Sequence, residues 1–325
     1  MPANLTPQYY KAEEIFKKSA SAEEKIAALE EMLAVIPKHK GTEKIQADLK
    51  KRLSKLREDS QKKTKASRKD PFAVKKQGAG QVVLLGFPNT GKSSLLSVMT
   101  KARPKISGYP FTTTLPLAGM MVYQDVMIQL VDTPPITEEF VPEGLTGALR
   151  NADAILILVD ASSDSCLEQL QTCYNYLESK NIINKAATDC EHGKQADQCL
   201  MLATKADDAN SSENINILRE LAPQGLEIIP VSAENGFGLE PMREKIYEII
   251  KVIRVYTKVP GKAPDMKKPF ILRRGSTVLD LASTIHRDLP RLMKNVRIWG
   301  SARYEGQSVN RDYILNDRDI VEINQ

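Results

Sequence analysis

Residues 82–98 read VVLLGFPNTGKSSLLSV and combine a short apolar run, a glycine-containing loop and the start of a helix. The loop has the spacing Gly86-x₄-Gly91-Lys92-Ser93, in which glycines let the backbone approach phosphates and the helix N-terminus adds a positive dipole. Lys92 is then expected to bridge the β- and γ-phosphates of a nucleotide, and Ser93 to bind Mg²⁺. The alternative is a glycine turn that binds nothing, and the strand–loop–helix context argues against it.

Further short apolar runs follow this unit, each ending in polar or turn residues. They are VMIQLVD (126–132), AILILVD (154–160), CLMLATK (199–205) and LEIIPVS (226–232). Helix-like stretches separate most of them, and residues 239–256 are predicted to form a closing helix. Alternating strands and helices predict an α/β domain with a doubly wound, mostly parallel sheet.

Polar residues at the ends of these runs favour guanine over adenine. Thr113 can offer a hydroxyl to Mg²⁺, and Asp132 can hold Mg²⁺ through water. Asp207 can accept two hydrogen bonds from N1 and N2 of guanine, a donor pair that adenine lacks. Residues 232–234 would place backbone N–H groups at the guanine oxygen. Either aspartate alone could be an ordinary helix N-cap, but five elements in this order point to a nucleotide site.

The predicted site therefore has three sets of residues. Those expected to act on the phosphates in catalysis are Lys92 and Thr113. Those expected to bind Mg²⁺ are Ser93, Thr113 and Asp132. Those expected to bind the nucleotide are Gly86, Pro88, Asn89, Thr90, Gly91, Lys92, Ser93, Ser94, Asp132, Thr204, Lys205, Asp207, Ser232, Ala233 and Glu234.

These motifs resemble those of the Obg superfamily of GTPases, within the translation-factor-related class. The segments that carry the resemblance are GFPNTGKSSLL, ISGYPFTTTLPLAG, DTPP and VSAENGFGLEPMREKIYEII. The developmentally regulated GTP-binding proteins are the most similar group, because residues 37–57 and 254–265 resemble their N-terminal helical region and their linker. The last segment resembles a TGS domain, a small ubiquitin-like β-grasp fold. The resemblance implies slow hydrolysis of GTP to GDP, with Mg²⁺, by a switch whose setting is the ribosome or translation.

The predicted organisation has four parts. Residues 1–76 form a helical hairpin with a basic arm, 77–256 the P-loop GTPase domain, 257–268 a linker and 269–325 the α+β TGS domain. The developmentally regulated relatives often have a domain inserted in the GTPase fold, and residues 81–256 leave no room for one.

Four residues bear on how far the family's chemistry transfers. Thr204 stands where the family normally has Asn, and Pro135 where it has a Gly whose N–H reaches the γ-phosphate. A neighbouring N–H, such as that of Ile136, is the alternative donor. Ile136 also occupies the place of the water-orienting Gln of Ras-like proteins. Asn89 resembles the Asn that binds K⁺ in potassium-activated relatives, although Asn also suits a turn for local reasons.

Charge is distributed unevenly along the chain. The 325 residues have a net charge of +5, but residues 38–76, the basic segment, contain fifteen Lys or Arg against five acids, a net +10. The last sixty residues have a net +4, which leaves −9 for the remainder. This asymmetry favours salt-dependent binding to RNA or the ribosome through the basic segment and the TGS domain. A solvated helix face is the alternative. A protein partner also stays open, whereas neither DNA nor a membrane is expected.

Composition excludes other classes. The hydrophobic fraction of 42% suits two or three folded domains, and the apolar run 154–159 is too short to span a bilayer. Without a signal peptide, we expect a soluble, cytoplasmic protein. Cys190, His192 and Cys199 do not have the spacing of common zinc sites and are expected to be ordinary residues.

Three functions fit this pattern. The first is a GTPase switch in which the loops 104–118 and 132–147 rearrange on hydrolysis. The second is a nucleotide-dependent RNA or ribosome scaffold with little turnover, and the third is an ATP-using relative. Lys205 and Asp207 argue against the third.

Overall fold

The computed structural model describes residues 6–19, 22–37, 42–67, 72, 74–100, 116–184 and 194–324. The chain divides into two compact units, residues 1–70 and 71–325. None of the helices in the described ranges is both long and apolar enough to cross a membrane.

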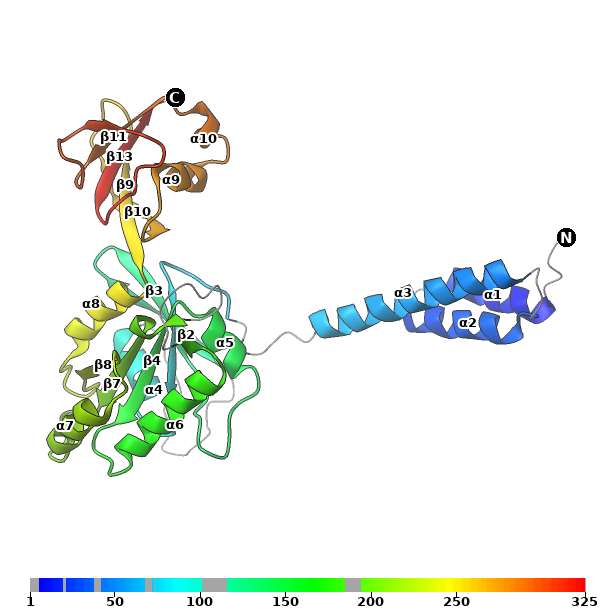
Figure 1. Cartoon of the computed structure of the whole chain (residues 1–325), viewed down its shortest axis with the longest axis horizontal. Coiled ribbons are helices and arrows are strands. Elements are labelled where there is room, and N and C mark those ends of the chain that lie inside the picture. Colours follow the sequence, from blue (N-terminus) through cyan, green and yellow to red (C-terminus); the bar gives the residue numbers. More distant parts are fainter. Residues whose placement is uncertain are drawn as a thin grey trace. The chain divides into compact units, whose positions relative to one another are not determined.

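The described residues of the first unit form three helices where the sequence predicted a hairpin of two (Figure 1). They are α1 (Pro7–Lys18), α2 (Ala22–Val35) and α3 (Glu43–Ser67). Thr6 caps α1 by accepting a hydrogen bond from the Tyr9 N–H, and Pro7 occupies the first turn, where no amide proton is needed. Ser19 ends α1 in an extended conformation. Ile15 of α1 is half exposed.

The second unit begins with a six-stranded sheet of order β2-β3-β1-β4-β7-β8. Its strands are β2 (Leu117–Tyr123), β3 (Val126–Asp132), β1 (Gln81–Gly86), β4 (Ala154–Asp160), β7 (Cys199–Thr204) and β8 (Glu227–Pro230). All neighbours pair in parallel except β2 and β3, so the prediction of a doubly wound, mostly parallel sheet is confirmed. Every residue of β1, β4 and β7 is buried, which explains their continuous apolar sequences.

Helices cover both faces of this sheet (Figure 1). Buried side chains of α5 (Leu145–Asn151), α6 (Cys166–Ser179) and α7 (Ser211–Leu221) belong to one hydrophobic core. Those of α4 (Lys92–Met99) and α8 (Leu239–Ile249) belong to the other.

The edge strand β2 was not predicted. A Cβ on its Gly119 would lie 2.4 Å from Thr100 Oγ1, so glycine allows the close approach of the segment that follows α4. A separate two-stranded sheet joins β5 (Ile183–Asn184) and β6 (Lys194–Gln195), and a short 3₁₀ helix, η1 (Ala196–Gln198), precedes β7.

A five-stranded sheet of order β10-β9-β13-β11-β12 follows. Its elements are β9 (Val252–Lys258), β10 (Asp265–Arg273), α9 (Val278–Ile285), α10 (Leu289–Leu292), β11 (Asn295–Trp299), β12 (Gln307–Val309) and β13 (Asp319–Asn324). Strands β9 and β13 pair in parallel and the other pairs are antiparallel. Val255, Leu281, Ile298 and Val321 form the centre of its core. This α+β arrangement agrees with the expected β-grasp fold.

The closing helix predicted over 239–256 is wrong in its second half. Helix α8 ends at Ile249, and the β-branched residues of VIRVYTK enter β9 instead. The predicted linker 257–268 likewise provides the end of β9, the start of β10 and the turn between them. Gly261 lies in this turn with φ at +75°.

Arg254 in β9 joins the two sheets. The residue is 3% exposed, and its guanidinium contacts Asp317 Oδ2 at 2.6 Å, Asp125 Oδ1 at 2.9 Å and Gln124 Oε1 at 2.6 Å. The Tyr256 hydroxyl donates to Asp125 as well. We call these five residues the Arg254 cluster. Gln124 and Asp125 form the turn between β2 and β3, so the cluster ties the second sheet to that hairpin.

Replacement of Arg254 by Met is expected to destabilise the region around the second sheet by about 3 kcal/mol, because both carboxylates would lose a buried cationic partner. Urea unfolding followed by the fluorescence of Trp299, the single Trp, measures this change. The control is Arg297→Ala on β11, whose exposed side chain is expected to change stability by less than about 0.5 kcal/mol. Equal urea midpoints for the Met variant and the wild type would contradict the prediction.

Candidate functional site

The predicted phosphate-binding loop lies between β1 and α4. Asn89 and Gly91 have φ values of 60° and 83°, a left-handed conformation that Gly and Asn tolerate best. A Cβ on Gly86 would lie 2.6 Å from the Leu158 carbonyl oxygen, so a larger residue would push the loop away from β4. Two glycines therefore shape the loop: Gly91 allows its turn, and Gly86 allows its close packing against β4.

Lys92 opens α4 and is buried, with 6% of its surface exposed. Its ammonium donates hydrogen bonds to the carbonyl oxygens of Gly86 at 3.0 Å and Phe87 at 2.6 Å. Burial lowers the pKa of Lys92 to about 8, although the negative charge of Asp132 opposes this shift. Both acceptors belong to the phosphate-binding loop, so the cation already lies where phosphates are expected to bind.

Asp132 and Ser93 form a pair at the carboxyl end of β3. The Ser93 hydroxyl lies 2.5 Å from Asp132 Oδ2, while Oδ1 is buried without a hydrogen-bond partner among the described residues. Burial raises the pKa of Asp132, and the Ser93 hydrogen bond and the Lys92 charge partly offset this effect. A buried carboxylate oxygen with no partner beside a hydroxyl is a donor set that fits Mg²⁺, which binds oxygen ligands. Thr113, the other predicted Mg²⁺ ligand, lies outside the described residues.

Thr204 ends β7 and holds the loop in place. Its buried hydroxyl lies 2.9 Å from the carbonyl oxygens of both Thr90 and Val159. The first of these contacts ties β7 to the phosphate-binding loop. Thr204, which stands where the family normally has Asn, therefore steadies the loop, and its hydroxyl is directed to backbone oxygens rather than to a base.

A cavity of about 430 Å³ adjoins the loop, and we call it the base cavity. The predicted residues that line it are Gly91, Ser94, Thr204, Lys205, Asp207, Ser232, Ala233 and Glu234. A hydrogen bond from Ser232 lowers the pKa of the exposed Asp207, so this carboxylate is ionised and can accept hydrogen bonds. The Ser232 oxygen also accepts the N–H groups of Glu234 at 3.2 Å and Asn235 at 3.3 Å, which fixes the turn that follows β8.

Lys205 has a partner that the sequence did not reveal. Its ammonium lies 2.5 Å from Asp160 Oδ2, and its backbone has a φ of 55°. Asp160 ends β4 as Asp132 ends β3, and this shared position was the signal that could have identified it. Val98 of α4 also lines the base cavity and is 46% exposed, an apolar surface suited to the face of a base.

The residues after Asp132 depart from the family pattern in a way that the structure explains in part. Ile136 is fully buried in the core, and its N–H donates to the Gly86 carbonyl oxygen at 3.2 Å. The alternative γ-phosphate donor is thus already bonded to the loop. Since its side chain packs in the core, Ile136 does not orient water.

The described residues contain no group of three or more His, Cys, Asp or Glu that could hold a metal ion. Cys199, considered above for zinc, is buried in β7, and Cys190 and His192 lie outside the described residues.

Comparison with known proteins matches residues 81–188 to the family of 50S ribosome-binding GTPases and residues 253–324 to the TGS domain. A GTP-binding protein of Methanocaldococcus jannaschii is 31% identical over 93% of this chain and 92% of its own length. A homolog of developmentally regulated GTP-binding protein 2 from Dictyostelium discoideum is 28% identical over 92% of this chain and 98% of its own. A GTP-binding protein of Sulfolobus solfataricus, solved with GDP, covers 76% of this chain and 68% of its own at 18% identity and a TM-score of 0.41.

Asp207→Asn is expected to weaken GDP binding about 100-fold, because a carboxamide cannot accept both guanine hydrogen bonds that a carboxylate accepts. Titration with a fluorescent GDP derivative measures this loss. Asp208→Asn is the matched control, since Asp208 lines the same cavity but its Oδ1 accepts the N–H of Asn210, which Asn can also do. A GDP affinity that Asp207→Asn leaves unchanged would show that Asp207 does not contact the base.

GDP binding is expected to weaken as the pH rises above about 8, because the free site then loses the Lys92 proton that the phosphates require. Below that pKa the affinity should be constant. Titrations between pH 7 and 9 test this, and Lys92→Ala, which binds more weakly, should show a flatter profile. Parallel profiles for the two proteins would refute the role of Lys92.

Proposed function

The chain belongs to the family of developmentally regulated GTP-binding proteins, and we propose that it hydrolyses GTP to GDP and phosphate as a cytoplasmic switch that acts on the ribosome or on structured RNA. The observation that supports this most strongly is the continuity of the base cavity with the phosphate-binding loop. Gly91 and Thr204 line the cavity, and Thr204 bonds to the loop at Thr90.

Hydrolysis requires in-line attack of water on the γ-phosphorus, with cleavage of its bond to the β–γ bridging oxygen. Lys92 would move from the loop carbonyls to the β- and γ-phosphates and neutralise their charge. Mg²⁺ held by Ser93 and Asp132 would supply further neutralisation of the phosphate oxygens. Ile136 is buried and cannot orient the water, and Pro135 has no N–H to offer the γ-phosphate, so we expect slow intrinsic turnover.

Asn89 gives a reason to include K⁺ in this proposal. It is exposed in the phosphate-binding loop, where a carboxamide oxygen could bind a monovalent cation beside the phosphates. Such a cation would supply charge that an arginine supplies in other GTPases. The left-handed φ of Asn89 is the local reason for Asn that competes with this role.

A second candidate is a nucleotide-dependent RNA scaffold with little turnover, favoured by the burial of Ile136. Use of ATP is disfavoured, because Asp207 and Ser232 line the base cavity together and offer no feature that selects adenine.

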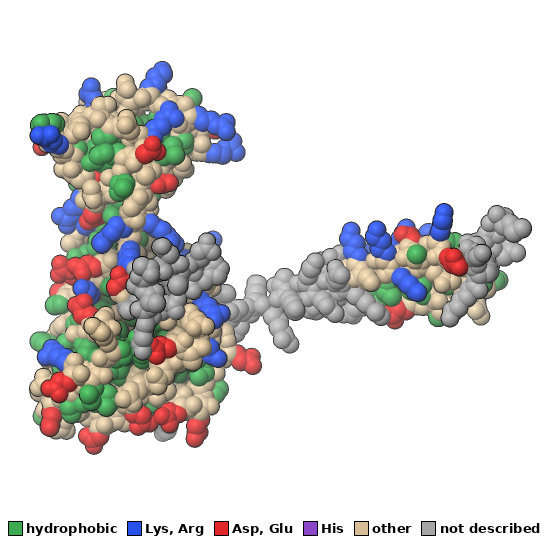
Figure 2. Space-filling view, viewed as in Figure 1, with side chains coloured by type: hydrophobic (Ala, Val, Ile, Leu, Met, Phe, Trp, Pro, Cys, Tyr) green, Lys and Arg blue, Asp and Glu red, His purple; other side chains and the backbone are tan. Residues whose placement is uncertain are grey.

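RNA binding is proposed for the basic segment. In its described part, Leu49 packs in the core of the first unit while Lys50, Lys51 and Lys55 are exposed on α3. Figure 2 shows Lys and Arg side chains along the described part of α3, whereas Asp and Glu side chains gather on the end of the second unit farthest from the chain's C-terminus. Exposed lysines on a helix attract phosphates and give salt-dependent affinity.

We expect multiple-turnover phosphate release from GTP, faster with ribosomes and faster in K⁺ than in Na⁺ at equal ionic strength. The triple variant Lys50→Gln, Lys51→Gln and Lys55→Gln should keep the basal rate and lose most of the ribosome stimulation. Neutralising Lys11, Lys17 and Lys180, three exposed lysines outside α3, is the control for net charge.

The outcomes separate the candidates. Binding of GTP and ribosomes without multiple turnover would favour the scaffold, and competition by ATP against labelled GTP would favour an ATP-using relative. Equal rates in K⁺ and Na⁺ would remove K⁺ from the proposal.

A further inference from the structure

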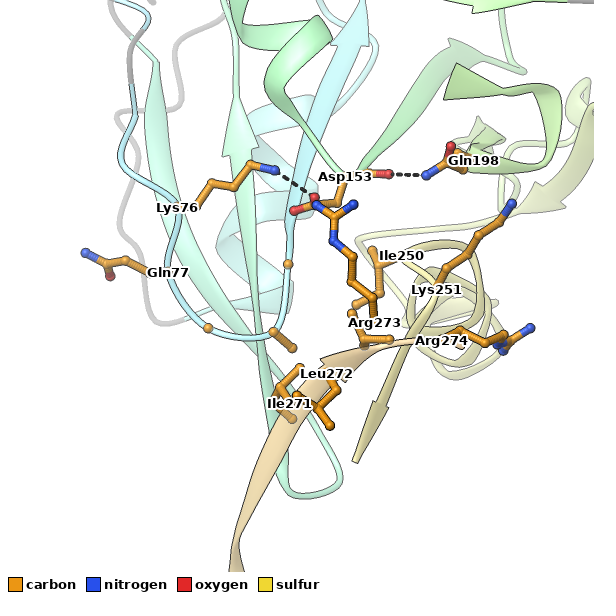
Figure 3. A pocket seen from close by; sticks show the side chains of 14 residues that line it. Lys76, Gln77, Asp153, Gln198, Ile250, Lys251, Ile271, Leu272, Arg273 and Arg274 are labelled. Atoms are coloured by element: carbon orange, nitrogen blue, oxygen red, sulfur yellow. Dashed lines mark hydrogen bonds and ion pairs between the residues drawn. The ribbon is translucent and has the colours of Figure 1, made fainter. Parts of the chain in front are cut away.

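A second cavity, of about 500 Å³, lies at the edge of the first sheet opposite the nucleotide residues (Figure 3). Three of the residues that line it come immediately before a strand of that sheet: Gly80 before β1, Asp153 before β4 and Gln198 before β7. The other wall comes from the end of α8 and from residues 271–274 at the end of β10. We call it the basic cavity, since four of its lining side chains are cations: Lys76, Lys251, Arg273 and Arg274.

Two of these cations are neutralised. Lys76 lies 2.6 Å from Asp153 Oδ1, and Lys251 lies 2.8 Å from Asp197 Oδ2. Asp153 is itself held in place, because its Oδ2 accepts the Gln81 N–H at 2.8 Å. The Asp153 carboxylate therefore holds the start of β1 in place, and its charge in the basic cavity is neutralised by Lys76.

Arg273 and Arg274 are different. Both side chains are exposed, and neither guanidinium has an ion pair or hydrogen bond to any residue in the described part of the chain. In Figure 3 the Arg273 side chain extends toward the Lys76–Asp153 pair, while that of Arg274 points away along the wall. Both exposed side chains are free to turn, and an anion would bind where Arg274 turns toward Arg273. The planar donors of two guanidiniums match phosphate oxygens.

Apolar side chains complete the basic cavity. Ile250, Val252, Ile271 and Leu272 line it beside the arginines. The backbone positions of this wall are fixed: Arg273 pairs with Val252 across β9 and β10, and the Arg274 N–H donates to the Lys251 carbonyl oxygen at 2.8 Å. A ligand of this site therefore needs an anionic group and a flat or apolar group attached to it, within a volume typical of small-molecule sites.

We propose that the basic cavity binds a phosphorylated nucleoside unit, with its phosphate on Arg273 and Arg274 and its base and ribose on the aliphatic wall. The unit could come from a single-stranded RNA or from a free nucleotide. Lys76, which lines this cavity, is also the last cation of the basic segment. The RNA source rests on the proposed function, whereas the free nucleotide does not.

The test uses the full chain saturated with GDP and Mg²⁺, so that the base cavity is filled. Adenine ligands are used because Asp207 disfavours them at that site. Fluorescence anisotropy with a labelled oligoadenylate hexamer measures the RNA source, and calorimetry with AMP measures the free nucleotide. For at least one ligand, Arg273→Ala combined with Arg274→Ala should weaken binding about tenfold or more.

For the hexamer, the slope of log affinity against log salt should also fall by about 1.4, as expected for two lost phosphate contacts to a single strand. The double Lys variant at the same positions should restore part of the affinity. Arg287→Ala with Arg303→Ala, at exposed positions outside the cavity, is the control with equal charge change and should bind normally.

The results distinguish the sources and the proposals. If AMP competes with the hexamer, the two ligands share one site. If AMP does not compete, while the Arg273→Ala, Arg274→Ala variant binds the hexamer more weakly, RNA is the source. Hexamer binding that depends on Lys50, Lys51 and Lys55 but not on the two arginines would overturn this inference and leave the RNA role intact. Adenosine binding as tightly as AMP, or a polyglutamate peptide binding more tightly than either ligand, would overturn it too.

Discussion

Parallel pairing within the first sheet is the constraint on which the nucleotide site depends. In a parallel sheet all carboxyl ends lie at one edge, so residues far apart in the sequence must meet there. The register shows this directly: Gly86 pairs with Leu158 in β4, and Asp160 pairs with Thr204 in β7. The placing of the loop, of the Ser93–Asp132 pair and of the base cavity is thus a consequence of how strands align, more than of any contact among the site residues.

That arrangement places charges where water is scarce, and the site compensates each of them locally. The Lys92 ammonium is held by loop carbonyl oxygens, and one oxygen of Asp132 is held by the Ser93 hydroxyl. The remaining Asp132 oxygen has no partner among the described residues. As an acceptor this oxygen needs a hydrogen-bond donor or a cation, and a Mg²⁺ bound beside Ser93 would supply one.

Sequence patterns predicted the parts of the structure that are locally determined. The central strands were found because burial on both faces requires continuous apolar runs, and the loop because its glycines serve backbone geometry. The boundary after α8 was missed because the apolar residues of β9 continue the helix pattern. These residues form a strand because they pair with β10 and β13. The partners of Arg254 could not be predicted, since they lie in turns far along the chain and are chosen by tertiary packing. The partner of Lys205 was missed, although Asp160 ends β4 as Asp132 ends β3.

Asp125 and Asp132 flank a single short strand, β3, which spans roughly 20 Å. One end of this strand meets the Arg254 cluster and the other end meets Lys92 and Ser93. Sliding the β2–β3 hairpin by one residue along β1 would pull Asp125 from Arg254 and Asp132 from Ser93 together. The β2–β3 hairpin is therefore held at both ends, and the TGS domain, through the Arg254 cluster, holds the end opposite to Asp132, the predicted Mg²⁺ ligand.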